Sequence, residues 1–141
     1  MCMVLYLGSE KPLPLIAWDE DKPSFHVTEL PEDLNGVRQQ FSKPYVYYLG
    51  SHQGCGCGFS YGQYENDDEE LEARECVSRL SKYLSQAVEI AGALELYSCW
   101  SGDEEEPPSF QENVTQDEIP TEFGGESFCF QEREFIAVTT R

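Results

Sequence analysis

The sequence predicts an α+β fold in a single domain over residues 1–141. We expect a mostly antiparallel sheet of about five to seven strands, with mixed pairing as the alternative. One long helix at about residues 66–91 and a short helix at about 32–41 cover this sheet. Short apolar runs bounded by Gly and Pro, and one amphipathic stretch with signals at both ends, predict this architecture. Hydrophobic residues make up 40% of the chain and aromatic residues 13%, which excludes a disordered chain.

Four strands are predicted in the first third of the chain. Residues 2–7 form a continuous apolar run that ends at a glycine, and residues 15–18 and 25–28 are shorter runs that follow prolines. Residues 45–49 read YVYYL, which is aromatic or β-branched at nearly every position. The spacing of these runs is typical of a sheet built from short strands.

The short helix is predicted between two prolines. Pro31 suits a first helical turn because the N–H that proline lacks has no partner there, and the acidic Glu32 and Asp33 favour the positive end of the helix dipole. Pro44 cannot continue a helix. We therefore expect a helix at about residues 32–41.

The long helix carries both a start and a stop signal. Asn66 and Glu69 form a capping box, and Gly92 suits the left-handed residue that ends many helices. Between them, apolar residues recur at spacings of three and four, while Arg79 and Lys82 fall outside this stripe. The stripe consists of Ala73, Val77, Leu80, Leu84, Ala87, Val88 and Ala91. At 1.5 Å per residue the helix is on the order of 37 Å long, which is enough to cross a sheet.

The last third of the chain predicts further strands. Residues 94–100 alternate, with Leu94, Leu96, Ser98 and Trp100 on one side and Glu95, Tyr97 and Cys99 on the other. Residues 110–123 are polar and suit an extended excursion with one edge strand. Residues 128–130 and 135–138 are expected to form a hairpin that lies centrally in the sheet, because both of its faces are apolar. In this hairpin, Phe128, Phe130, Phe135 and Ala137 share one face, and Cys129, Ile136 and Val138 share the other.

The charge of the chain bears on its partners. Twenty-seven acidic and nine basic residues give a net charge of −18, and residues 83–132 contain twelve acidic residues and no Lys or Arg. Such a surface repels phosphate backbones and anionic lipids, so we expect no nucleic-acid binding and no membrane binding. A basic protein is the expected partner, as for an immunity-type inhibitor of a basic toxin or nuclease, or for a nucleic-acid mimic.

The opening residues and the cysteines predict a cytoplasmic protein. The apolar residues 1–7 have no Lys or Arg before them, as a secretory signal would, and no apolar run reaches the length of a membrane span. Six cysteines without an export signal indicate reduced thiols.

The most unusual segment is residues 50–59, which read GSHQGCGCGF. In an extended chain, Cys55 and Cys57 point to the same side, and two thiolates at this spacing reach one soft metal ion. His52 joins them if the chain bends at Gly54, and Cys99 on a neighbouring strand completes a tetrahedron. This hypothesis assigns zinc or copper to His52, Cys55, Cys57 and Cys99.

The alternative for this segment is structural packing, which the sequence favours. Zinc motifs commonly use Cys-x-x-Cys rather than Cys-x-Cys, and buried cysteines pack as small hydrophobic residues. A redox pair is disfavoured because residues i and i+2 of a strand lie about 6.6 Å apart at Cα. A phosphate-binding loop is excluded by the missing Lys-Ser/Thr ending.

Two function classes follow. The favoured one is a non-enzymatic interaction domain with an anionic surface for a basic partner, and the alternative is a metal-binding or redox thiol protein. A hydrolytic enzyme ranks third, because two histidines do not supply a convincing nucleophile, base and orienting acid. We consider Cys2 only as an N-terminal nucleophile. That role requires a free amine on Cys2, and Met1 precedes it.

Overall fold

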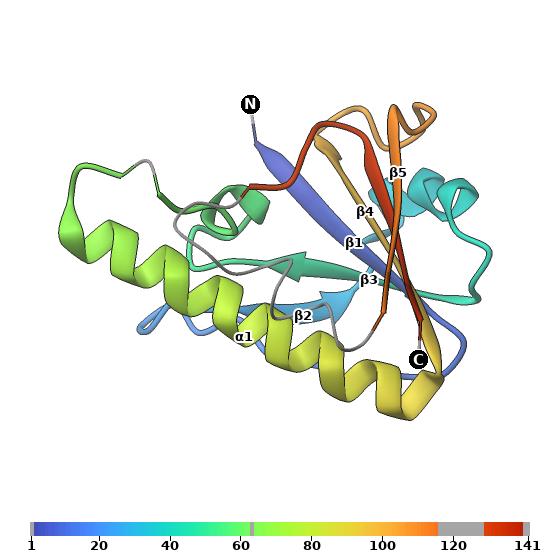
Figure 1. The fold of residues 1–141 in the computed structure, drawn as a ribbon, viewed down its shortest axis with the longest axis horizontal. Coiled ribbons are helices and arrows are strands. Elements are labelled where there is room, and N and C mark those ends of the chain that lie inside the picture. The colour runs from blue at the N-terminus through green and yellow to red at the C-terminus, as the bar shows by residue number, and fades with distance from the viewer. Residues whose placement is uncertain (1, 63, 116–128, 140–141) are drawn as a thin grey trace.

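The computed structural model describes residues 2–62, 64–115 and 129–139, which form one mixed sheet with one long helix packed on it (Figure 1). The strand order is β2-β3-β1-β4-β6-β5, and every neighbouring pair is antiparallel except β5 and β6, which are parallel. This confirms the predicted α+β class. The elements are β1 (Met3–Ser9), β2 (His26–Glu29), 3-10 helix η1 (Glu32–Gln40), β3 (Tyr45–Gly50), 3-10 helix η2 (Gly56–Gly58), α1 (Asp67–Ala91), β4 (Ala93–Trp100), β5 (Phe110–Thr115) and β6 (Glu134–Thr139).

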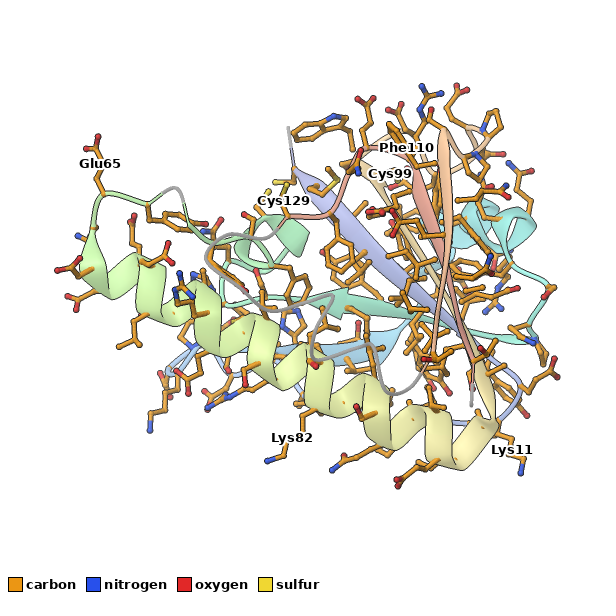
Figure 2. All side chains as sticks on the ribbon, viewed as in Figure 1. Lys11, Glu65, Lys82, Cys99, Phe110 and Cys129 are labelled. Carbon is orange, nitrogen blue, oxygen red and sulfur yellow. The ribbon has the colours of Figure 1, made fainter. Side chains whose placement is uncertain are left out.

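Helix α1 begins and ends where the sequence predicts. The Asn66 side chain accepts hydrogen bonds from the backbone N–H groups of Asp68 and Glu69, and Gly92 follows the helix with a φ of 84°. Figure 1 shows α1 lying diagonally across one face of the sheet, and Figure 2 shows Lys82 projecting from its outer side. The residues of α1 that are buried are Ala73, Cys76, Val77, Leu80, Tyr83, Leu84, Ala87 and Val88. The predicted stripe is confirmed except at Ala91, which is only partly buried, and Cys76 and Tyr83 widen it.

The sheet is covered on both faces. The larger core cluster joins α1 to residues such as Leu7, Leu49 and Leu96 on one face. The smaller cluster joins Val37 of η1 to Tyr97 and other residues on the opposite face. The predicted alternation along β4 is therefore confirmed, because its odd and even positions enter different clusters.

One predicted strand, at residues 15–18, is wrong. The structure forms a single antiparallel bridge here, in which Ile16 and Val27 exchange two backbone hydrogen bonds of 3.0 and 2.9 Å. The neighbouring strand β2 has only four residues and lies at the edge of the sheet, so it offers little length for pairing. Leu15 and Trp18 remain exposed, at 53% and 38%, which removes the burial that would favour a longer strand.

The predicted hairpin of residues 128–130 and 135–138 is also wrong. The second strand exists as β6, but it pairs with β4 on one side and β5 on the other. Both of its edges are occupied, so no neighbouring position is left for residues 129–130, which form no strand. Phe130 packs in the α1-side cluster with Ile136, whereas Phe135 lies on the η1 side. Phe128 lies outside the described residues.

Two other predictions hold with a change of detail. The short helix is present over Glu32–Gln40 but takes the 3-10 form, with Val37 as its one buried residue. Such a small apolar contact provides little packing energy for a regular α-helix. Within the predicted excursion at 110–123, β5 is an edge strand, and residues 116–123 lie outside the described part.

Hydropathy along the helices bears on membrane insertion. Among the described residues, no helix combines the length and the apolar character that crossing a membrane requires.

Candidate metal centre

Three cysteine sulfurs converge at one end of the sheet. The Sγ atoms of Cys2, Cys55 and Cys57 all lie within 4.8 Å of one another. Cys2 directly precedes β1, Cys55 is the residue before η2, and Cys57 lies within it. Cys2 is exposed and the other two are partly buried, so the cluster lies at the surface of the molecule. Clustered thiolates of this kind are typical ligands of soft metal ions.

Strand pairing brings these distant residues together. Strands β1 and β3 are antiparallel with Leu5 opposite Leu49, so the chain that leaves β3 emerges beside the beginning of β1. The loop then turns back at η2 and lies against the first residues of β1. A Cβ atom on Gly56 would lie 3.0 Å from the carbonyl oxygen of Met3. Glycine between the two cysteines therefore permits the close approach that places their thiols beside Cys2.

Ser51 holds the loop in this shape. Its hydroxyl donates to the carbonyl of Cys55 at 2.6 Å and accepts from the backbone N–H groups of Gln53 and Gly58 at 3.2 and 3.1 Å. The Ser51 backbone N–H also donates to the Cys55 carbonyl at 2.9 Å. Gly54 has a φ of 87°, a conformation that glycine adopts without steric cost. The turn is thus fixed by a fully buried serine.

Backbone amides are directed at the sulfurs. The N–H of Met3 donates to Cys57 Sγ at 3.2 Å, and the N–H of Cys57 donates to the sulfur of Cys55. Burial raises the pKa of Cys55 to about 12; the Cys57 amide opposes this increase, and the neighbouring thiols of Cys57 and Cys2 add to it. Cys55 is therefore protonated at neutral pH. A metal ion that displaces its proton would find N–H donors already placed to stabilise the thiolate.

Two cavities adjoin the cluster. Cys2 and Cys55 line a cavity of about 520 Å³, and Cys57 lines a second one of about 270 Å³. The smaller cavity is also lined by Trp100 and Cys129, and Figure 2 shows Cys129 near the beginning of β1. A ligand could therefore reach the thiols from either side.

His52 lies in a different cluster from the one predicted. Its Nδ1 atom is 3.3 Å from Cys76 Sγ, its backbone N–H donates to the same sulfur at 3.4 Å, and its Nε2 atom is 3.6 Å from a carboxylate oxygen of Glu72. Burial raises the pKa of the Cys76 thiol, and the His52 amide opposes this increase. Cys76 is therefore a buried thiol that fastens the loop to α1.

Cys99 also lies apart from Cys55 and Cys57. It is opposite Val4 in the β1–β4 pair and fully buried in the cluster that faces η1. Burial raises its pKa to about 12, and the nearby Glu104 adds to the increase. Of the four residues in the predicted site, the structure brings together only Cys55 and Cys57.

Cys2 was considered from the sequence only as an N-terminal nucleophile, and not as a metal ligand. The sequence signal that could have found Cys2 is the pairing of two predicted strands, 2–7 and 45–49. An antiparallel arrangement of this pair places residue 2 beside whatever follows residue 49. Each of the six cysteines, Cys2 included, is a free thiol in the structure.

Comparisons with known proteins give no further guide to this site. Neither a protein-family model nor a curated protein nor a solved structure matches the chain. The chemistry of the described residues is therefore the basis of the functional argument.

Proposed function

We propose that this protein binds a single thiophilic metal ion, zinc or copper(I), through Cys2, Cys55 and Cys57. The convergence of three thiols from two separate segments is the observation that supports the proposal. Zn–S bonds of about 2.3 Å place two sulfurs of a tetrahedral site about 3.8 Å apart. Sulfurs that lie within 4.8 Å of one another need only small side-chain rotations to reach this separation.

The proposed site is suited to reversible binding. Structural zinc sites are closed by four protein ligands, whereas this cluster has an exposed Cys2 and lies at the edge of two cavities. The core between α1 and the sheet contains none of the three cysteines, so its packing does not depend on a metal. We therefore propose metal sensing or delivery, in a reducing compartment such as the cytoplasm.

A competition titration with variants tests the proposal. Reduced protein is titrated with Zn²⁺ and, separately, with Cu(I) against a chromophoric chelator. We expect one ion per chain, and at least about 100-fold weaker binding for Cys55→Ser. This factor follows because four-ligand zinc sites are worth about 10–16 kcal/mol, or about 3 kcal/mol per ligand. Cys129→Ser is the matched control, since Cys129 is an exposed thiol outside the cluster. Equal affinity for wild type and Cys55→Ser would refute the three-thiol site.

We also retain the proposal of a basic protein partner, which rests on the charge of −18. Anionic surfaces attract basic partners at long range and lose this attraction when salt screens the charges. We expect association with poly-lysine at about 0.05 M salt that is lost at about 0.5 M, and no retention on duplex DNA or RNA at physiological salt. Nucleic-acid binding that weakens as salt rises would contradict the charge argument.

A further inference from the structure

We propose that the cavity of about 520 Å³ between β1, β3 and η1 binds an organic ammonium ion. This site, called here the aromatic cavity, adjoins the proposed metal site because Cys2 and Cys55 also line it, but the proposal uses none of the three thiols. Its volume falls in the range that small-molecule sites occupy. The residues that line this cavity include Tyr6, Trp18, His26, Asp33, Tyr48 and Glu104.

Four packed aromatic rings form one wall of this cavity, in which Trp18 and Tyr48 keep exposed surface while Tyr6 and His26 are buried. The Trp18 and His26 rings have centroids 4.7 Å apart at 67°, and the Tyr6 and Tyr48 rings are 5.8 Å apart at 70°. His26 links the two pairs, since its ring lies 6.4 Å from that of Tyr48. Edge-to-face packing holds these rings in fixed orientations. Aromatic faces attract cations, and quaternary ammonium groups are their best-known organic ligands.

A buried carboxylate adds negative charge to this wall. Glu104 is 8% exposed, and its two oxygens accept hydrogen bonds from the Tyr6 hydroxyl at 3.0 Å and from the Gly102 N–H at 2.9 Å. Both donors are neutral, and no ion pair of Glu104 with another described residue is present. Buried charges are normally paired, so this carboxylate favours a cationic ligand.

The phenol of Tyr6 cannot take the place of that cation. Burial raises its pKa well above the usual value, and the charge and hydrogen bond of Glu104 raise it further. The hydroxyl therefore remains a neutral donor to Glu104 at every physiological pH. Glu104 therefore accepts hydrogen bonds from two neutral donors and forms no ion pair with a described residue.

The rest of the lining has the same electrostatic character. Asp33 of η1 adds a second carboxylate, and no Lys or Arg is found among the described residues that line the cavity. An anionic ligand would meet repulsion from both carboxylates, and an uncharged one would leave Glu104 without a counter-charge. A positively charged group with an apolar surface satisfies both the rings and the carboxylates.

Fluorescence of Trp18 provides the test. The chain has two tryptophans, so Trp100→Phe leaves Trp18 as the only reporter. The full-length variant, reduced and freed of metal by a chelator, is titrated with choline and with its uncharged isostere 3,3-dimethyl-1-butanol. We expect a saturable change with choline, and at least about tenfold weaker binding of the alcohol. Equal binding of choline and the uncharged alcohol would overturn the proposal.

A matched pair of variants assigns binding to the buried carboxylate. We expect Glu104→Gln to weaken choline binding at least about tenfold and Glu105→Gln to leave it within about twofold. Both substitutions change the net charge by one, but Glu105 is exposed and does not line the cavity. Near-UV circular dichroism checks that each variant is folded. If Glu104→Gln fails to fold, Asp33→Asn takes its place, since Asp33 is exposed and lines the cavity. We expect Asp33→Asn to weaken choline binding at least about threefold. Equal effects of the lining variant and Glu105→Gln would overturn the proposal.

A second probe distinguishes the source of the ammonium group. The peptide acetyl-Gly-Lys-Gly-amide carries the same charge on an amino-acid side chain. Tighter binding of choline would identify a small-molecule ligand, and tighter binding of the peptide would identify a lysine on a protein partner. Either result supports an ammonium site. If neither choline nor the peptide binds, the proposal is refuted.

Discussion

Replacing Leu84 by alanine is expected to lower the free energy of unfolding by about 2 to 5 kcal/mol. Leu84 has no exposed surface and lies in the cluster between α1 and the sheet. Truncation removes three buried carbon atoms and leaves a cavity between a 25-residue helix and several strands, which cannot collapse around it independently. Urea unfolding followed by circular dichroism measures the change.

The same helix supplies the control for this prediction. Leu71 is 65% exposed, so Leu71→Ala removes the same atoms without opening a cavity. We expect the free energy of unfolding of that variant to lie within about 0.5 kcal/mol of the wild-type value. A loss below about 1 kcal/mol for Leu84→Ala, or equal losses for the two variants, would contradict the placement of Leu84 in the core.

Metal affinity is expected to rise steeply with pH, by about 100-fold between pH 6 and pH 8 from Cys55 alone. The pKa of Cys55 is raised to about 12 in the metal-free protein, mainly by burial, so the thiol holds its proton throughout this range. The metal binds the thiolate and must displace that proton. Each unit of pH lowers the proton concentration tenfold, so the apparent dissociation constant falls tenfold per unit for this ligand.

Proton release measures this linkage directly. Adding one equivalent of Zn²⁺ to weakly buffered protein at pH 7 should release at least one proton per ion. Cys55→Ser should release one proton fewer than wild type, while Cys129→Ser should match wild type. An affinity independent of pH between 6 and 8 would show that Cys55 is not a ligand.

Local signals determined much of the fold. Helix α1 could be read from Asn66, Gly92 and the apolar stripe because capping and helical periodicity involve residues only a few positions apart. The strands at residues 2–7, 45–49 and 94–100 were also identifiable, since each is a short apolar or alternating run with clear boundaries. The bridge at Ile16 and the neighbours of β6 were not identifiable, because they depend on which strand edges remain free.

The candidate metal site was likewise only partly predictable from the sequence. The sequence by itself determined that Cys55 and Cys57 share a glycine-rich segment after a strand, because they are two residues apart. Only the tertiary structure decided that Cys2 joins them, that His52 contacts Cys76, and that Cys99 lies in the other core cluster. The reason is physical: these residues are far apart in the chain, with His52 and Cys76 already 24 positions apart. They meet through strand order, antiparallel register and the packing of α1 on the sheet, which no local segment sets.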